Sequence, residues 1–306
     1  MTHRMRTLAV CAAIALSVTL LLTSRPRAAA LTTFQFNILG ISSSSGTASI
    51  APGQFAVIRF SVTNPSTGTA YDLRTDPAWT QTASGNSRLF LQVGWTTAEF
   101  TNVDSGSNTV GGRGAGIPIP INALAANVVA NGDGTYTATA PLPIPASANG
   151  SSGVIMEGHP AGQDTTGAWT LRMPVRSVVR YFPITGTTAV PRRQIVDANK
   201  CLNCHRSDGT GVAPQLTVHG NNRTEEPQAC VMCHNPNATD IVFRLATDPK
   251  VVIGRNTYAE QSLDFKRLIH GIHASSRGFR PQSARRHCIQ PHRVRRQHAD
   301  AIPGPP

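Results

Sequence analysis

Charged and aromatic side chains are scarce in this sequence. Of its 306 residues only 14% are charged and 6% are aromatic, whereas 26 are glycine and 22 are proline. This composition excludes a coiled coil or a helix bundle and favours a β protein rich in turns. The length leaves room for about two domains with buried cores.

Long apolar runs are also lacking, apart from one near the start. Fifteen apolar or small residues extend from Leu8 to Leu22, two arginines precede them, and three alanines follow at Ala28 to Ala30. A positive start, a short apolar stretch and small residues are the order of a secretory signal peptide, which we assign to residues 1–30. No later window approaches the roughly 18 apolar residues of a membrane span, so we expect an exported chain with no transmembrane span.

The positive charge is confined to parts of the chain. The formal net charge is +12, but residues 31–190 have seven Arg and seven acidic residues, whereas residues 191–306 have seventeen Lys or Arg and nine acidic residues. A nucleic-acid-binding protein usually has a continuous basic surface. We therefore predict no nucleic-acid partner.

Residues 31–190 also lack the patterns of a catalytic site. They contain no paired carboxylates, and the glycine-rich run Gly111–Gly116 fits neither of the common phosphate-loop patterns. His159 has no Ser or Cys nucleophile context, so a structural role is the better interpretation. We expect this part of the chain to support and dock other parts.

Alternating apolar and polar residues predict strands in the same region. The alternation is clear over residues 33–39, 55–63 and 89–95, and further strands are predicted over 135–139, 169–175 and 178–184. Turn residues separate these segments. The predicted fold class is a mainly β N-terminal domain, either an Ig-like sandwich or a Greek-key split barrel, followed by an irregular, loop-rich domain with one or two short helices.

Four of the six cysteines lie in two motifs of the same form, each followed directly by a histidine. These are Cys201-Leu202-Asn203-Cys204-His205 and Cys230-Val231-Met232-Cys233-His234. In a CxxCH motif the two thiols add to the vinyl groups of a haem, and the adjacent histidine is the proximal ligand of its iron. We therefore predict two covalently attached haems c, with His205 and His234 as iron ligands.

Zinc and disulfides are the competing explanations of these cysteines. Two CxxC pairs can form a four-thiolate zinc site, but here 25 residues separate Cys204 from Cys230, more than the usual spacing of such pairs. Zinc also does not require a histidine directly after each pair. Disulfides would be expected in an exported chain, and both alternatives remain weaker than haem c.

Three further histidines are candidates for the distal ligands of the two irons. His219 lies between the two motifs, and His270 and His273 lie in an approximate helical stripe over residues 258–273. A spacing of three residues places two imidazoles on neighbouring positions of one helix face. An iron bound by two imidazoles has no open position, so it transfers electrons and does not bind oxygen.

The order of these motifs resembles that of a known family. Pro191 to Asp197 leads into CLNCH, and LTVHG, Arg223, ACVMCHNP and DFKRLIHGIH follow in turn. This order resembles the OmcA/MtrC family of outer-membrane decahaem c-type cytochromes. The resemblance covers residues 191–273 and implies that His219, His270 and His273 are distal ligands. It also implies electron export at the cell surface to metal oxides, flavins or partner cytochromes of an outer-membrane electron conduit.

The chain departs from this family after the second motif. Members of the family have about ten haems, whereas this sequence has two CxxCH motifs and three candidate distal histidines. Residues 277–306 lack apolar periodicity and are mostly Arg, Pro, His, Gln and Ala. We interpret them as a disordered basic tail, produced by truncation or a frameshift; a genuine basic tail for an anionic partner is the alternative. A metal site formed by Cys288, His287, His292 and His298 is a less favoured interpretation of these residues.

These features define four segments and a function. The segments are a signal peptide (1–30), a β-sandwich or split-barrel domain (31–190), a di-haem cytochrome c domain (191–276) and the tail (277–306). Because residues 200–240 have little apolar material, we expect the porphyrins to form the core there and the haem-free segment not to fold stably.

We predict an exported, extracellular or periplasmic electron carrier at the outer membrane, in which electrons hop between haems. It would be an electron-transfer protein rather than a bond-making enzyme, with metal reduction as an activity. A surface binding or adhesion module with non-functional haem motifs is the alternative, and an enzyme with an open haem site is a second one.

Overall fold

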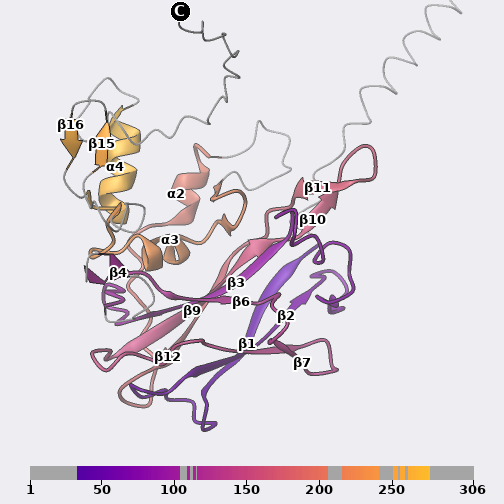
Figure 1. Cartoon of the computed structure of the whole chain (residues 1–306), viewed down its shortest axis with the longest axis horizontal. Coiled ribbons are helices and arrows are strands. Elements are labelled where there is room, and N and C mark those ends of the chain that lie inside the picture. Colours follow the sequence, from indigo (N-terminus) through magenta and orange to yellow (C-terminus); the bar gives the residue numbers. More distant parts are fainter. Residues whose placement is uncertain are drawn as a thin grey trace, which may run out of the picture. The chain divides into compact units, whose positions relative to one another are not determined.

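A computed structural model of the chain describes residues 33–103, 109–110, 113–114, 116–205, 216–240, 251–253, 256–258 and 261–275 (Figure 1). These residues form two compact units, one that ends at Asp264 and one that begins at Phe265. The predicted signal peptide, the predicted tail with Cys288, and half of the Gly111–Gly116 run lie outside the described residues.

Two four-stranded antiparallel sheets form the first unit. One sheet has the strand order β1-β2-β8-β7, and the other has the order β12-β9-β3-β6. The strands of the first sheet are β1 (Gln35–Ser43), β2 (Ala56–Thr63), β8 (Tyr136–Thr139) and β7 (Val129–Ala130). Those of the second are β12 (Val178–Pro183), β9 (Ser151–His159), β3 (Arg88–Trp95) and β6 (Ile119–Asn122). The prediction of a mainly β, loop-rich fold is confirmed.

The predicted alternation places one set of side chains between the sheets. In β2, Ala56, Ile58, Phe60 and Val62 are all fully buried, and β1 pairs with β2 from Gln35↔Thr63 to Ser43↔Ala56. They pack in one apolar cluster with residues of the second sheet such as Leu89, Leu91 and Val93. Alternate residues face the opposite sheet because successive side chains of a strand point to opposite sides.

Strand β9 is the main element that the sequence analysis missed. All nine of its residues, SSGVIMEGH, are buried, and it pairs with β3 on one side and β12 on the other. A strand buried on both faces has no polar face, so it shows no alternation. Two glycines further weaken its strand pattern.

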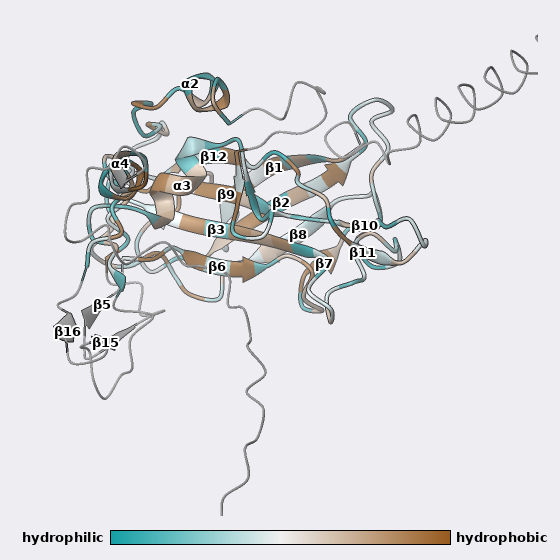
Figure 2. Ribbon diagram, turned by 90° about the horizontal axis from the view of Figure 1, so that it is seen from above, coloured by the Kyte–Doolittle hydropathy of each residue, from teal (hydrophilic) through white to brown (hydrophobic). Residues whose placement is uncertain are grey.

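The outer face of β9 and β3 is covered by the segment that contains the second CxxCH motif. Helix α3 (Pro227–Cys233) lies over this sheet (Figure 2). Gly94 and Gly153 are cross-strand partners on β3 and β9, and the side chain of Met232, 0% exposed, packs against both. A β-carbon on Gly94 would lie 2.6 Å from Cγ of Met232, so the two glycines permit the close approach of the helix.

Four further strand pairs and two further helices make up the rest of the described secondary structure. The remaining strand pairs are β4 (Thr109–Val110) with β5 (Arg113–Gly114), β10 (Ala161–Gln163) with β11 (Trp169–Arg172), β13 (Thr217–Val218) with β14 (Arg223–Thr224), and β15 (Val251–Ile253) with β16 (Asn256–Tyr258). The other helices are α2 (Ala198–Leu202) and α4 (Phe265–Ser275). Helix α4 begins at Phe265, later than the predicted stripe over residues 258–273, and the first residue of that stripe, Tyr258, ends β16. No helix in the described part of the chain is long and apolar enough to cross a membrane.

His159 occupies a structural position at the end of β9. Its side chain is 0% exposed, and its Nδ1 lies 3.0 Å from the carbonyl oxygen of Asn86. Burial lowers the pKa of His159 to about 4, so the ring is neutral in the folded protein.

Substitution of Gly94 tests the contact between sheet and helix. Gly94→Val should destabilise the protein by about 1–3 kcal/mol, because the added side chain overlaps Met232. Hydrogen exchange should show the loss of protection concentrated in α3 and the strands below it. Gly40→Ala is the control, since its β-carbon would meet nothing closer than 3.9 Å. Equal effects of the two substitutions would contradict the proposed packing.

Candidate haem-binding site

The second CxxCH motif is part of a well-capped helical turn. Glu226 is the N-cap of α3, its carboxylate accepts from the backbone N–H of Gln228, and Pro227 begins the helix. The backbone N–H of His234 donates to the carbonyl of Cys230 at 2.8 Å. These bonds fix the turn, so that the two cysteines and the histidine of the motif occupy consecutive turns of one short element.

His234 is oriented by a bond on the far side of its ring. Its Nδ1 lies 2.9 Å from the carbonyl oxygen of Leu263. Because a carbonyl can only accept, this contact assigns the proton to Nδ1 and leaves Nε2 as the nitrogen with a free lone pair. Such a bond to the outer nitrogen is typical of a histidine that binds a metal.

His219 lies at the start of the loop that joins β13 and β14. Its φ of 56° is in the left-handed region, which few residues other than glycine adopt. The loop is attached to the β domain at two points: the N–H of Gly158 donates to the carbonyl of Asn222 at 2.8 Å, and the side-chain amide of Asn221 donates to the carbonyl of Arg172 at 2.7 Å. A strained residue held in this way is a candidate for function.

The structure brings His219 and His234 together. Their ring centroids are 6.0 Å apart and the ring planes differ by 27°. Two imidazoles that bind one iron from opposite sides, each at about 2 Å, have centroids roughly 6 Å apart. The spacing of this pair therefore fits two ligands of one iron, next to the motif that is predicted to attach a haem.

Burial and one guanidinium control the protonation of both rings. His219 is an exposed residue, but desolvation of its ring, together with the charges of Arg223 and His234, lowers its pKa to about 4. Burial likewise lowers the pKa of His234, against the effect of its bond to Leu263. Both rings are thus neutral at pH 7, the form that binds a metal.

The sheet supplies a counter-charge for Arg223. Nη2 of Arg223 donates to Glu157 of β9 at 2.8 Å, and its Nε lies 2.7 Å from the other carboxylate oxygen. The sequence analysis did not nominate Glu157, which is a single acidic residue without a motif around it.

The first CxxCH motif is more open. Asp197 caps α2 by accepting from the N–H of Asn199 at 2.9 Å, and the N–H of His205 donates to the carbonyl of Cys201 at 2.9 Å. Cys204 and His205 are exposed, and Cys201 is half-buried. Burial is the main cause that raises the pKa of the Cys230 thiol, and the charge of Cys201 is the smallest.

Helix α4, which belongs to the second unit, contains both His270 and His273. Both are exposed, and Nδ1 of His273 lies 2.8 Å from the carbonyl oxygen of Ile269. Phe265, Leu268 and Ile269 are half-buried, whereas Ile272 is 53% exposed. The two residues stay predicted distal ligands.

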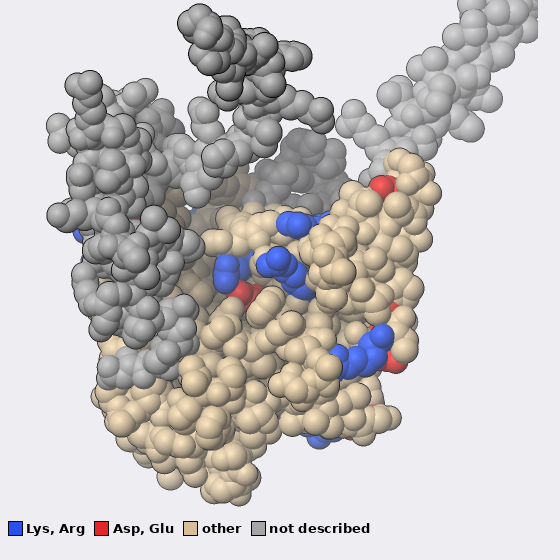
Figure 3. Space-filling view, in the orientation of Figure 1, with Lys and Arg blue, Asp and Glu red and all other residues tan. Residues whose placement is uncertain are grey.

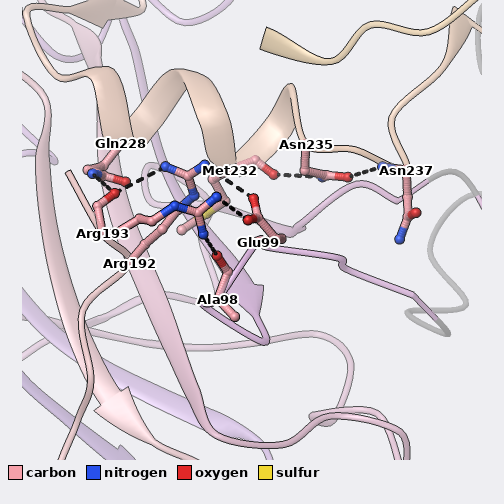
Figure 4. A network of polar contacts seen from close by, with 8 residues as sticks. All are labelled: Ala98, Glu99, Arg192, Arg193, Gln228, Met232, Asn235 and Asn237. Atoms are coloured by element: carbon pink, nitrogen blue, oxygen red, sulfur yellow. Dashed lines mark hydrogen bonds and ion pairs between the residues drawn. The ribbon is translucent and has the colours of Figure 1, made fainter. Parts of the chain in front are cut away.

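The segment before the first motif connects the β domain to α3 (Figure 4). Arg192, 8% exposed, lies 3.4 Å from the carboxylate of Glu99. Arg193 pairs with the same carboxylate and also donates to the carbonyl of Ala98 at 3.0 Å. Its own carbonyl accepts from the side chain of Gln228 in α3 at 3.4 Å. Part of the sequence that carries the family resemblance therefore has a structural role.

Asparagines attach the other end of α3. The side-chain amide of Asn102 donates to the carbonyl of Met232 at 2.8 Å, and its oxygen accepts from the N–H of Trp95 at 3.0 Å. The side-chain amide of Asn235, 1% exposed, also donates to the carbonyl of Met232, at 3.0 Å. The end of the helix is thus bonded to β3 and to the turn after the motif.

The four motif cysteines are free thiols. Among the residues that the structure describes, no group of three or more His, Cys, Asp or Glu could hold a metal ion on its own.

The arrangement fits the haem site that the sequence predicts. In a c-type cytochrome a CxxCH histidine and a second imidazole can bind one iron, and here the two rings lie 6.0 Å apart. The comparisons with known proteins agree. Residues 193–301 match the family model of the outer membrane cytochrome MtrC/MtrF-like, domains II/IV. Over these residues the chain is similar to the MtrC/MtrF-like cytochromes, in agreement with the resemblance found in the sequence.

A solved structure shares the fold. The chain is similar to MtrC from Shewanella baltica OS185, with a TM-score of 0.51 and 14% sequence identity. The similarity covers 84% of this chain and 40% of that chain, so this chain spans less than half the length of the solved one. No curated protein sequence matches it. The family match extends to residue 301 and includes part of the predicted tail.

Thiol reactivity tests the packing around the second motif. Burial raises the pKa of Cys230 to about 11 and that of Cys233 to about 12. Because the thiolate is the reactive form, a haem-free chain at pH 8 should be alkylated at Cys204 at least tenfold faster than at Cys233. Quantitative mass spectrometry of the modified peptides measures both rates. Equal rates at all four cysteines would show that this segment is unfolded without haem and would contradict the described packing.

Proposed function

We propose that this protein is an exported c-type cytochrome with two haems c, which transfers electrons between other cytochromes and extracellular acceptors. The observation that carries the proposal is the 6.0 Å spacing of His219 and His234 beside an attachment motif. The family match over residues 193–301 supports it independently. Cys201 and Cys204 would attach the first haem and Cys230 and Cys233 the second, with His205 and His234 as proximal ligands.

The protein contributes positions and charges rather than bond chemistry. When bound, a haem supplies an iron that is oxidised and reduced by one electron. His234, oriented by Leu263, and His219, held by its loop, would bind the iron of the second haem and keep small molecules from it. An electron would pass from one haem to the next. His270 and His273 are further proposed distal ligands.

Two arginines next to the His219 loop support the proposal by their charge. Basic side chains gather near β3 and the β10–β11 hairpin on the face drawn in Figure 3. Nη2 of Arg172 and Nη2 of Arg88 would lie 3.7 Å and 3.9 Å from a β-carbon on Gly85, and Nη1 of Arg172 would lie 2.9 Å from one on Gly220. No ion pair to either arginine is found among the described residues. Haem propionates are anions that could pair with them.

The proposed partners follow the family. Electrons would arrive from partner cytochromes of an outer-membrane conduit and leave to metal oxides or flavins, with the protein at the outer-membrane surface. Reduction of a metal oxide would be an outer-sphere electron transfer, so the protein would not be a bond-making enzyme. A surface binding or adhesion module, the second candidate, would not require the two imidazoles to face each other.

Removal of His219 tests the proposed ligand pair. After export and maturation, the wild-type chain should bind two haems by pyridine haemochrome assay, with a low-spin spectrum that carbon monoxide leaves unchanged. His219→Ala should keep both haems, because the attachment residues remain, but convert one of them to a high-spin form that binds carbon monoxide. Added imidazole should restore the low-spin spectrum of that haem.

Val218→Ala is the matched control, since Val218 precedes His219 in the same hairpin and is 43% exposed. It should leave the spectrum unchanged. A low-spin spectrum for both haems in His219→Ala would rule out His219 as a ligand. A wild-type chain with no covalent haem would rule out the cytochrome and favour the adhesion module.

A further inference from the structure

One buried carboxylate faces the second motif from the sheet. Glu157 is 2% exposed and lies on β9, on the side covered by α3 and β14. Its oxygens contact Arg223 at 2.8 Å and 2.7 Å, and the side-chain amide of Gln92 donates to one of them at 3.2 Å. The side chain of Arg223 is 18% exposed. Both members of this ion pair are therefore largely withdrawn from water.

Stability does not explain why the pair is there. Removing two charges from water costs several kcal/mol per ion, and well-packed apolar residues in place of a buried pair are often as stable or more so. Residues of β9 that share the outer face with Glu157 are apolar or small, such as Ile155 and Gly153. An apolar residue at position 157 would suit this face, so a charge there calls for another reason.

The pair is ionised in the folded protein. Burial raises the pKa of Glu157, while the charge of Arg223 opposes this effect. Burial alone would lower the pKa of Arg223, but the charge of Glu157 outweighs it and raises that pKa. Because a guanidinium keeps its proton in proteins, and because both contacts are short, we treat the two groups as charged.

The charge of Arg223 acts on every side chain of the second site. It helps to lower the pKa of both His219 and His234. It also opposes the rise in pKa that burial causes at Cys230 and Cys233. Arg223 is the cross-strand partner of Val218, the residue before His219, so the guanidinium belongs to the same hairpin as a proposed iron ligand, and its counter-charge comes from the β domain.

We propose that Glu157, by neutralising Arg223, keeps the reduction potential of the haem at the second motif low. This inference rests on the proposed function. A ferric haem has one more positive charge than a ferrous haem, so an uncompensated guanidinium beside it favours reduction. Glu157 removes that bias, and the ion pair makes the β domain a regulator of the potential as well as a support. Glu157 is a positioning and tuning residue, because it acts through Arg223.

The test is a spectroscopic redox titration of the matured, full chain. Glu157→Gln leaves Arg223 without a counter-charge and should raise the potential of one of the two haems. Glu157→Gln combined with Arg223→Gln removes both charges and should return that potential toward the wild-type value. If the pair only supported the structure, the potential of the double variant would differ from the wild-type value at least as much as that of Glu157→Gln does. That result would overturn the inference.

Further variants separate charge from folding. Asp133→Asn removes a carboxylate from the exposed ion pair with Arg59, whose side chains are both 52% exposed, and should leave both potentials unchanged. Arg223→Lys keeps the positive charge and should shift the potential less than Glu157→Gln does. If Glu157→Gln does not mature, a potential of the neutral double variant far above that of the wild type would overturn the inference.

The haem content of each variant separates this inference from the proposed function. A wild-type chain without covalent haem would refute the function itself. Two haems in every variant, with the potentials of Glu157→Gln equal to those of the wild type, would refute the tuning role and leave the function intact.

Discussion

The structure depends on one packing constraint: the central strands β9 and β3 are buried on both faces. Their inner faces meet the other sheet of the sandwich, and their outer faces need a cover of their own. Helix α3 and strand β14 provide it, and they also contain the second motif and Arg223. Met232 can approach closely enough because Gly94 and Gly153 have no side chains. The position of the haem attachment motif is therefore set by the same contacts that bury the sheet.

This constraint changes how the role of the β domain is understood. The sequence analysis expected porphyrins to form the core around residues 200–240. In the structure, Ala229, Val231, Met232 and Ala238 are buried, so the protein itself provides part of that core. The β domain also holds the His219 loop through Gly158 and Arg172, and supplies Glu157 to Arg223. It thus fixes both imidazoles of the second site and the charge beside them.

The sequence predicted those parts of the site that have local patterns. The two motifs are contiguous, and strands with one polar face alternate visibly, so the CxxCH residues and most strands of the sandwich were found. Strand β9 was missed because burial on both faces removes the alternation. Glu157 and the Gly94–Gly153 pair were missed because their meaning lies in contacts with residues far along the chain. His219 was nominated from its place between the motifs, but its pairing with His234 depends on the fold of the loop.

The central claim is that one haem is bound at the second motif by His219 and His234 together. The most direct measurement is an electron paramagnetic resonance spectrum of the oxidised, matured chain with Cys201→Ala and Cys204→Ala, which leaves only the second attachment site. The account predicts one covalent haem, on the peptide that contains Cys230 and Cys233, with the low-spin signal of two imidazole ligands. A high-spin signal, or a chain without haem, would contradict it.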